Sequence, residues 1–211
     1  MASTKRIFNM MGVDRKIKNI NSPLILKDCK ADISFENVGF SYDDQKPLFK
    51  CFNLSIPFGS SIGIVGDTGS GKTTIAKLLL RLYDIDNGKI TIGDTSINTI
   101  DISFLRRRIG IVNQSPFLFN ATIKDNIRYG LNNLSIDQIE HAANQSQATE
   151  FIEKLPKSFD TMVGERGQML SGGQQQRIAI ARTIVRNPDI IIFDEATSSV
   201  DNKTEQLIQK A

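Results

Sequence analysis

The chain has 211 residues, of which 40% are hydrophobic, and its 26 basic and 23 acidic side chains give a net charge of +3. This length can bury about 70% of the unfolded surface, as one large domain or two small ones, so no disulfide or metal staple is required. The charged residues are scattered along the chain, which gives no support to nucleic-acid binding. The two cysteines, Cys29 and Cys51, favour a reducing compartment. No apolar run approaches the roughly 18 residues of a membrane span, so the sequence predicts a soluble piece.

The first 30 residues are expected to be a linker. Residues 2–11 can form a short helix, and the polar, irregular stretch over residues 16–30 contains Pro23. The sequence "DISFENV" then alternates apolar and polar residues with the period of a half-buried strand, and a second strand is predicted over residues 48–56. We therefore expect an antiparallel β edge in the first hundred residues, within a domain that covers residues 31–211.

Two later segments, "SIGIVG" (residues 61–66) and "DIIIFDE" (residues 189–195), have consecutive apolar residues instead. Such runs predict strands that are buried on both faces, as in a parallel sheet covered by helices. Helical patterns follow both, and between them Ser135 and Gln138 have the spacing of a capping box, which starts a helix. The predicted fold class is an α/β core with an antiparallel β subdomain and an α-helical insert that begins near residue 123.

The sequence "GDTGSGKTT" matches the phosphate-binding pattern GxxxxGKT between an apolar strand and a helix. Glycines let the backbone wrap a phosphate, and the start of the helix adds partial positive charge. Lys72 would supply a full positive charge at the β and γ phosphates, and the Thr73 hydroxyl would bind Mg²⁺. The candidate nucleotide-binding residues of this stretch are Gly66, Asp67, Thr68, Gly69, Ser70, Gly71, Lys72, Thr73 and Thr74.

Two carboxylates end the second apolar run, where a buried parallel strand would reach the ligand side of its sheet. Asp194 can hold the Mg²⁺, directly or through water, and Glu195 would polarise the water that attacks the γ phosphate. Without a phosphate loop in the same chain, the pair would equally suit a solvated acidic strand end.

The sequence "LSGGQ" (Leu170 to Gln174) precedes another helical run. Ser171 and Gln174 again have capping-box spacing, so a well-capped helix is one interpretation. A cap needs no glycine pair, however, and bare amides at the start of a helix also bind anions. A second anion site could reach the γ phosphate in the Gly66 loop only if another copy of the domain presents it.

This arrangement resembles the nucleotide-binding domain of ABC transporters, in which two domains enclose two ATP molecules head to tail. The resemblance runs from about Asp32 to the end and implies a P-loop NTPase (RecA-like) core, with the signature motif on the helical insert over about residues 123–185. It implies that Ser171, Gly172, Gly173 and Gln174 bind the partner copy's nucleotide, and that Asp201 in "SSVD" lies at the dimer seam.

The same resemblance assigns two further residues. Gln114 in "IVNQSP" is similar to the glutamine that reaches the metal and senses the membrane partner, although alone it would be an exposed loop residue. Tyr42 in "FSYDD" is similar to the aromatic residue that stacks on adenine, although a tyrosine at a strand end usually only packs. Lys72, Gln114 and Glu195 are the implied catalytic residues, and Thr73, Gln114 and Asp194 the implied Mg²⁺ ligands. Because Tyr42 would offer the base only an aromatic face for stacking, the site is expected to prefer ATP over GTP only modestly.

The exporter branch of the family is indicated by "TMVGERG" and "FLFNATIKDNIRYG", and "ASTKRIF" resembles the link that follows the last membrane helix of a half-transporter. The implied partners are a transmembrane domain of the same or a paired chain and a second nucleotide-binding domain, in a homodimer or heterodimer, with no nucleic acid. The implied location is the cytosolic or organelle-matrix face of a membrane.

The sequence departs from the family pattern beyond Ala211, because the switch histidine and the later strands of the sheet are not in it. His141, the single histidine, lies in the helical insert and is expected to be an ordinary surface or packing residue. Two apolar sheet edges would then lack their neighbour, and we expect this piece to bind MgATP with little or no turnover.

Three classes of function therefore remain open at this stage. The first is an ATPase that powers export, and the second is an ABC ATPase outside transport, in DNA repair or translation. The third is a nucleotide-binding regulatory module without catalysis. Glu195 argues against the third for the parent protein, and "VGERG" argues against the second.

Overall fold

The computed structural model describes residues 17–42 and 46–194, and these form two compact units. Within the described residues, unit 1 comprises residues 17–27 and 31–105, and unit 2 comprises residues 28–30 and 106–194. The expected helices over residues 2–11 and 202–211 lie outside the described residues, as do Glu195 and Asp201.

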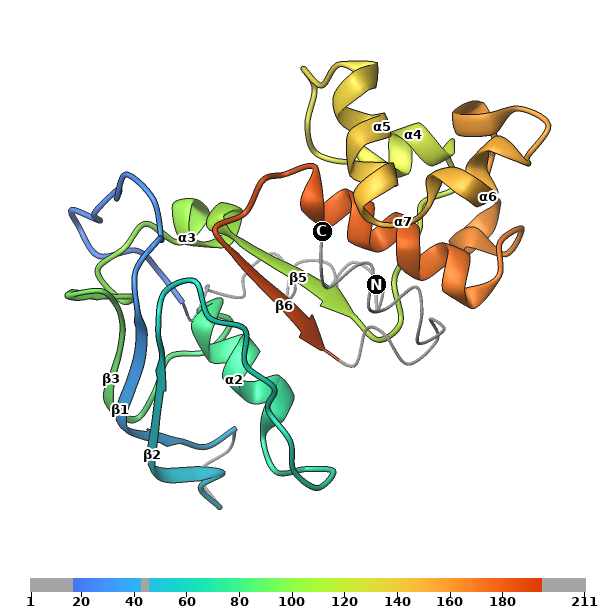
Figure 1. The fold of residues 1–211 in the computed structure, drawn as a ribbon. Helices are drawn as coiled ribbons and strands as arrows, with labels where there is room; N and C mark the ends of the chain where they lie inside the picture. Colours follow the sequence, from blue (N-terminus) through green and yellow to red (C-terminus); the bar gives the residue numbers. More distant parts are fainter. Residues whose placement is uncertain (1–16, 43–45, 195–211) are drawn as a thin grey trace, which may run out of the picture. The chain divides into compact units, whose positions relative to one another are not determined.

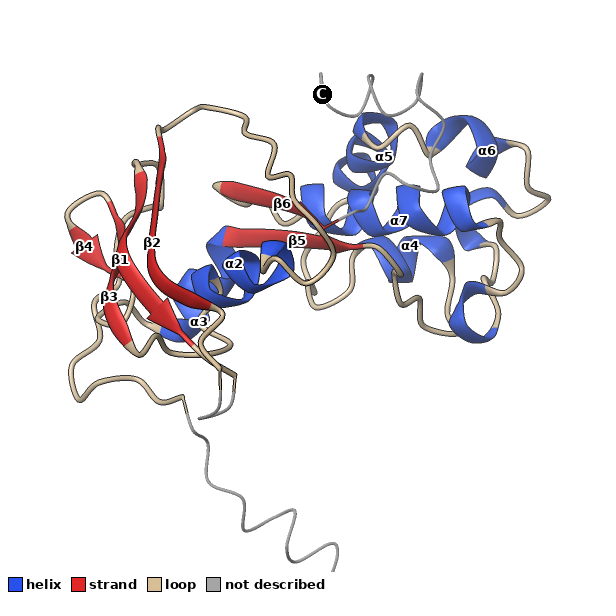
Figure 2. Cartoon of the chain, turned by 90° about the horizontal axis from the view of Figure 1, so that it is seen from below, coloured by secondary structure: helices blue, strands red, loops and turns tan. Residues whose placement is uncertain are grey.

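Unit 1 contains an antiparallel sheet with the strand order β2-β1-β3-β4, as Figure 2 shows. The two strands predicted first along the chain are confirmed. The helix predicted after the phosphate loop is confirmed as well, as α2. The elements that begin in this unit are β1 (Ile33–Phe40), β2 (Phe49–Ile56), α2 (Lys72–Leu79), β3 (Asn87–Ile92), β4 (Thr95–Ser96) and α3 (Ile102–Arg108).

The alternation in β1 changes phase at a bulge. Ile33 and Phe35 are buried with the half-buried Ser34 between them, and the pairing register with β2 then shifts between Phe35 and Val38. Asn37 lies in this bulge with a φ of 49°, a left-handed conformation that asparagine tolerates better than most residues. The bulge restores the inward direction, so Val38 and Phe40 are buried too. Strand β1 therefore carries apolar side chains into the core along its whole length.

Unit 2 combines a parallel strand pair with a group of helices (Figure 1). A capping box at Ser135 and Gln138 begins α5, which confirms the start predicted from their spacing. His141 is exposed on this helix, as expected of a surface residue. The elements are β5 (Ile109–Asn113), α4 (Ile123–Ile127), α5 (Ile136–Gln145), α6 (Thr149–Glu153), the 3-10 turns η1 (Ser158–Asp160) and η2 (Glu165–Gly167), α7 (Gly172–Ile184) and β6 (Ile190–Asp194).

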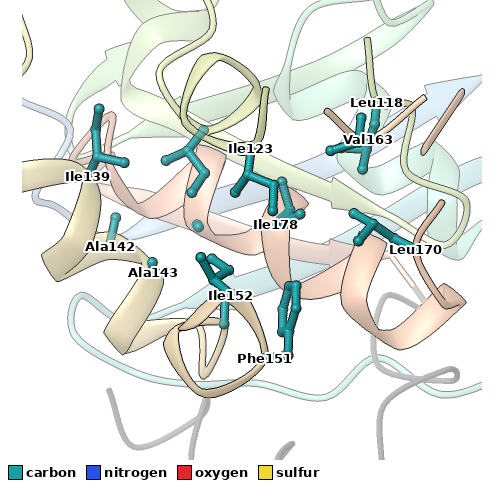
Figure 3. Packing of buried hydrophobic residues seen from close by; sticks show 13 residues of the cluster. Leu118, Ile123, Ile139, Ala142, Ala143, Phe151, Ile152, Val163, Leu170 and Ile178 are labelled. Atoms are coloured by element: carbon teal, nitrogen blue, oxygen red, sulfur yellow. The ribbon is translucent and has the colours of Figure 1, made fainter. Parts of the chain in front are cut away.

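One apolar cluster holds the helices of unit 2 together. Ile123 of α4, Ile139 of α5, Ile152 of α6 and Ile178 of α7 all point into it (Figure 3), and each is at most 4% exposed. Complete burial of such side chains stabilises a fold by about 1.5–3 kcal/mol each, before entropy is subtracted. Ile178 belongs to the helix that follows "LSGGQ", so this cluster fixes the position of that helix within unit 2.

Residues 28–30 also belong to unit 2. The backbone N–H of Cys29 donates to the Asp189 carboxylate at 2.9 Å, and Arg108 lies 3.6 Å from the same carboxylate oxygen. Burial raises the pKa of the Cys29 thiol to about 11, so this thiol stays protonated at neutral pH. The short segment is thus tied to the loop that leads into β6.

The prediction of a buried strand over residues 61–66 is wrong. In the described part of the chain, residues 57–71 form no strand, and Ile62, Ile64 and Val65 are 43%, 41% and 93% exposed. A fully buried parallel strand needs hydrogen-bonded neighbours and a helix on each face. Among the described strands the parallel pairing is only between β5 and β6, so residues 61–66 have no ladder to join.

The second apolar run does form a strand, β6, which pairs with β5 in parallel from Ile109↔Ile190 to Asn113↔Asp194. Its predicted burial on both faces is wrong, because Ile191 and Phe193 are 41% and 43% exposed. Both apolar runs thus expose surface that further strands of a sheet would cover.

In the part of the chain that the structure describes, no helix has the length and apolar character needed to cross a bilayer.

Candidate functional site

The phosphate loop of unit 1 is an exposed turn that runs directly into α2. Gly71 precedes the helix with a φ of 100° and ψ of 11°, a left-handed conformation for which glycine is the natural residue. The Ser70 N–H donates to the Asp67 carbonyl at 3.1 Å, which closes the turn. Gly71, being a glycine, offers no side-chain cap to the start of α2. The first turn of this helix carries partial positive charge.

The side chain of Lys72 folds back onto the phosphate loop. Its ammonium donates to the Gly66 carbonyl at 2.8 Å and to the Asp67 carbonyl at 3.0 Å. The side chain thus curls over the loop and holds its charge among the backbone groups that surround a bound phosphate in this type of motif. The loop and its lysine fit a polyphosphate, which is what the sequence predicts for them.

Phe49 of β2 packs against Gly71, at the end of the phosphate loop. A Cβ atom placed on Gly71 would lie 2.6 Å from Cζ of Phe49 and 2.8 Å from Cε1, so there is no room for any side chain but hydrogen at this position. Phe49 is 8% exposed and stacks on Phe52 with ring centres 4.7 Å apart. The antiparallel sheet therefore fixes the place where the phosphate loop turns into its helix.

Tyr42 lies beside α2, close to the phosphate loop in space although distant in sequence. Its hydroxyl is 2.8 Å from Oγ1 of Thr74, and its ring is 43% exposed. The structure thus brings the predicted base-stacking residue next to the third residue of the phosphate-loop helix. Sequence reasoning missed Tyr83, whose ring meets Tyr42 edge-on at 5.1 Å, because nothing in its local pattern distinguishes it from a packing residue.

In unit 2, Gln114 and Asp194 are brought together by strand pairing. Asp194 ends β6 opposite Asn113, and Gln114 follows Asn113 directly at the end of β5. Because the carboxyl ends of parallel strands meet at one edge of a sheet, the amide and the carboxylate share that edge. Both are oxygen donors of the kind Mg²⁺ prefers. The third expected ligand, Thr73, belongs to unit 1.

The "LSGGQ" segment of unit 2 forms the capped start of α7. Ser171 Oγ accepts from the Gln174 N–H at 3.3 Å, and the Gln174 side-chain oxygen accepts from the Ser171 N–H at 2.9 Å. The capping box predicted from the spacing is confirmed. Ser171 and Gly172 are exposed, and Gly173 and Gln174 are half-buried. The segment is thus ordered by its own cap and open to a ligand on its surface.

Gln176 connects this helix to the end of β5. Its side-chain amide donates to the Asn113 carbonyl at 3.2 Å, and the residue is fully buried. It links α7, which carries the "LSGGQ" cap, to the residue that precedes Gln114. Sequence reasoning missed it, because in the run "GGQQQR" three identical residues give no signal of which one turns inward.

Arg182 ties the same helix to the segment after Gln114. Its guanidinium donates to the Phe117 carbonyl at 2.7 Å and to the carbonyl and the side-chain oxygen of Asn126, both at 2.8 Å. Burial lowers the pKa of Arg182 from its usual value, although the group remains charged at neutral pH. Arg177, on the same helix, lies over the ring of Phe151 at 5.1 Å. Asn126 and Arg182 were not singled out in the sequence.

The candidate residues therefore form two groups. The phosphate loop, Lys72, Thr73, Thr74 and Tyr42 lie in unit 1, and Gln114, Asp194 and the "LSGGQ" segment lie in unit 2. The predicted roles of Glu195, beside Asp194, and of Asp201 fall outside the described residues. Among the residues that are described, no three histidine, cysteine, aspartate or glutamate side chains gather as a metal site.

Comparison with known proteins agrees with this arrangement. The ABC transporter family matches residues 49–198 of the chain. ABC transporter B family member 4 of Dictyostelium discoideum is 48% identical over 195 residues, which are 92% of this chain and 25% of that protein. The mitochondrial iron-sulfur clusters transporter ATM1 of Saccharomyces cerevisiae is 43% identical over 203 residues, 96% of this chain and 29% of its own length.

A solved structure of a bacterial Atm1-family ABC exporter with ATP bound has a TM-score of 0.93 and 39% sequence identity, and the match covers 99% of this chain and 36% of that one. The chain therefore spans about a quarter to a third of these three proteins. The antiparallel sheet, the phosphate loop at the start of α2 and the capped "LSGGQ" helix are all within the matched residues. The chain belongs to the ABC transporter family.

Proposed function

We propose that this chain belongs to the ATP-hydrolysing part of a membrane exporter, that it binds MgATP, and that it acts as a head-to-tail pair of nucleotide-binding domains. The observation that carries the proposal is the start of α2, where Gly71 leaves the helix without a side-chain cap and Lys72 adds an ammonium to the loop. The anionic oxygens of a nucleoside triphosphate suit the partial positive charge of such a helix start.

In this proposal each unit contributes its own functions. The backbone of residues 66–71 surrounds the β and γ phosphates, Lys72 neutralises their charge, and Tyr42 stacks on the adenine. Mg²⁺, when bound, would neutralise phosphate charge as a Lewis acid, and Thr73, Gln114 and Asp194 are the residues that would hold it. Glu195 would accept a proton from the water that attacks the γ phosphate.

The second copy completes the site. Ser171 and the amides of Gly172 and Gly173 would bind the γ phosphate held by the partner's loop, and Asp201 would lie at the seam between the copies. What supports this is the exposed, ordered start of α7, whose cap leaves its first amides on the surface. The pair would be a homodimer or a heterodimer, and closure on ATP would drive a transmembrane domain of the same or a paired chain.

The links through Gln176 and Arg182 support a route from nucleotide to membrane domain. The two side chains bond α7 to residues on both sides of Gln114: Gln176 to residue 113, and Arg182 to residues 117 and 126. A displacement of the "LSGGQ" helix would therefore move these residues with it.

The test is ATP-dependent association of the full chain with Glu195→Gln, followed by sedimentation. We expect ATP to pair the molecules and Ser171→Arg to abolish the pairing. Ser135→Arg is the matched control, because Ser135 caps α5 with the same reciprocal hydrogen bonds but lies outside the proposed nucleotide site. Pairing that ignores ATP, or that Ser171→Arg leaves intact, would refute the two-copy site.

A further inference from the structure

The loop that leads into α7 is a tight turn whose two ends are buried. Val163 and Leu170 are 0% and 7% exposed and belong to the apolar cluster of unit 2 (Figure 3). The Met169 N–H donates to the Val163 carbonyl at 3.1 Å, and the Leu170 N–H donates to the Gly167 carbonyl at 2.9 Å. These backbone hydrogen bonds close the loop on itself, so residues 164–169 reach the "LSGGQ" segment in a defined conformation.

Gln175, the fourth residue of α7, fastens this loop to the helix. Its side-chain amide donates to the Gly167 carbonyl at 3.0 Å and to the Leu170 carbonyl at 3.1 Å. One NH₂ group carries two hydrogens and can serve both acceptors. Gly167 permits this close approach, because a Cβ atom there would lie 3.3 Å from Cδ of Gln175 and 3.0 Å from Cδ1 of Leu118. A single side chain of α7 thus bonds two points of the loop.

The peptide group that joins Leu170 to Ser171 is held at both of its polar atoms. Its carbonyl oxygen accepts from the Gln175 amide, and its N–H donates to the side-chain oxygen of Gln174 at 2.9 Å. Because a peptide group is planar, bonds at both atoms fix the orientation of the whole plane, and the Cα atom of Ser171 is placed with it. Two neighbouring glutamines of α7 therefore set the backbone from which the Ser171 side chain projects.

The helix does not need Gln175 in order to begin. The capping box of α7 is complete with Ser171 and Gln174 alone. The Gln175 amide instead bonds residues that precede the cap, at the middle and the end of the loop. The role of Gln175 is therefore to hold the loop against the helix start, which is a different task from capping.

We infer that Gln175 is a positioning residue for Ser171 in the two-copy ATP site. Its hydrogen bonds hold the end of the loop, and through the shared peptide group they hold Ser171, where a phosphate of the partner copy would bind. The inference rests on the proposed function and deepens it, since it concerns the same "LSGGQ" surface. Gln175 acts through Ser171, by way of its bonds to Gly167 and Leu170.

This arrangement has a thermodynamic reason. A loop that must be ordered when the partner arrives loses conformational freedom at that step, which weakens association. A loop that its own helix already holds loses that freedom on folding. The contact between Ser171 and the partner's nucleotide then contributes more fully to the affinity of the pair.

The experiment measures ATP-dependent pairing of the full chain in the Glu195→Gln background by sedimentation. Gln175→Met removes the donor group and keeps the length of the side chain, whereas Gln175→Lys keeps a donor as the conservative variant. Gln138→Met is the matched control, because Gln138 also bonds the backbone at the start of a helix, α5, outside the proposed site. Gln168→Lys, at an exposed position of the loop, controls for the charge that Gln175→Lys adds. The ATP affinity of the unpaired copy is measured by calorimetry in chains that also carry Ser171→Arg.

We expect Gln175→Met to weaken the pairing by about 3- to 30-fold, the range of one or two net hydrogen bonds. Gln175→Lys should keep most of the pairing, and Gln138→Met and Gln168→Lys should leave it unchanged. In a Ser171→Ala background, Gln175→Met should weaken the pairing less than it does alone, because it acts through Ser171. The ATP affinity of the unpaired copy should be the same with and without Gln175→Met, since the phosphate loop belongs to unit 1.

Normal pairing in Gln175→Met would overturn the inference, and so would a loss that persists undiminished in the Ser171→Ala background. An equal loss in Gln138→Met would reduce the effect to general destabilisation of the helices. Pairing strengthened by Gln168→Lys as much as Gln175→Lys exceeds Gln175→Met would reduce it to added charge. Either result also overturns the inference.

Gln175→Glu tests the same bonds if Gln175→Met folds poorly, because a carboxylate has the size of the amide but donates no hydrogen bond. Its pairing should be weakened as well, and normal pairing would contradict the inference. Failure of the Glu195→Gln parent to pair with ATP would overturn the proposed function itself, which distinguishes that result from all the others.

Discussion

Two helices of this protein begin at glycine-rich sequences, and they satisfy their first turns differently. At α7, Ser171 is extended and makes a reciprocal capping box with Gln174. At α2, Gly71 is left-handed and has no side chain with which to cap the helix. The residue just before each helix is the source of the contrast, because serine carries an acceptor and glycine carries none.

The difference shows how the two segments can share chemistry and differ in role. The start of α7 is stable by itself, because its capping box already provides hydrogen-bond acceptors for some of its backbone N–H groups. At α2 the N-cap residue gives no such bond, and the loop lysine donates to the carbonyls of Gly66 and Asp67. A phosphate bound at α2 would meet a helix start whose N-cap has no side-chain acceptor, whereas one bound at α7 would meet a start that already has a capping box.

The largest effect should come from Gly71→Ala. Alanine at a φ of 100° is strained, and its Cβ would lie 2.6 Å from Phe49 Cζ, inside the packed sheet. Together these should lower the free energy of unfolding by about 2–4 kcal/mol, which denaturant titration measures.

Gly69→Ala is the control for this change. Gly69 also has a positive φ, of 84°, but a Cβ there meets no described atom within 4 Å. Gly69→Ala should lower the free energy of unfolding by only about 1–2 kcal/mol, because only its backbone conformation is unfavourable for alanine. Equal losses in the two variants would show that Phe49 does not hold the loop.

Lys72→Met should weaken ATP binding by about 10- to 100-fold, because it removes the charged hydrogen bonds at the phosphates. Lys89→Met is the charge-matched control, since Lys89 is exposed and pairs with Glu36 on the sheet at 3.0 Å. Calorimetric titration should show near-normal ATP affinity for the control. Similar losses in both would mean that net charge, and not the loop lysine, drives binding.

Ser171→Ala and Ser135→Ala remove the same type of cap from α7 and α5. Each should lower the free energy of unfolding by about 1 kcal/mol. Only Ser171→Ala should also weaken the ATP-dependent pairing measured by sedimentation in the Glu195→Gln background. If both variants pair normally, the α7 cap serves the helix alone.

The smallest effect is expected for Gly66→Ala. Its Cβ would lie 2.9 Å from the Ser70 hydroxyl, which can rotate away. The loss of unfolding free energy should stay below about 1 kcal/mol and should vanish in combination with Ser70→Ala. A larger loss that Ser70→Ala does not relieve would show that the loop backbone is more constrained at Gly66 than at Gly69.

Elements that depend on neighbours in the sequence were predicted well. The two capping boxes follow from residues three positions apart, so their spacing alone identifies α5 and α7. The alternation in "DISFENV" likewise identified β1. These signals are local, because hydrogen bonds over three residues and the pleat of a strand do not require the rest of the fold.

Elements that depend on distant partners were predicted less well. The run over residues 61–66 has the composition of a buried strand, but no described strand pairs with it, and Val65 is 93% exposed. The inward turn of Gln176 and the bonds from Arg182 to Asn126 also escaped prediction. Apolar composition states what a segment can bury, and only its neighbours decide whether it does.

The sequence by itself determined the phosphate loop, the capped "LSGGQ" helix and the family that they indicate, because each is recognised from residues only a few positions apart. Only the tertiary structure decided that Phe49 lies under Gly71, that Thr74 bonds Tyr42, and that α7 is tied to the segment around Gln114. These contacts join residues 22 to 65 positions apart. Contacts over such distances arise from the packing of whole strands and helices, which no short stretch of sequence specifies.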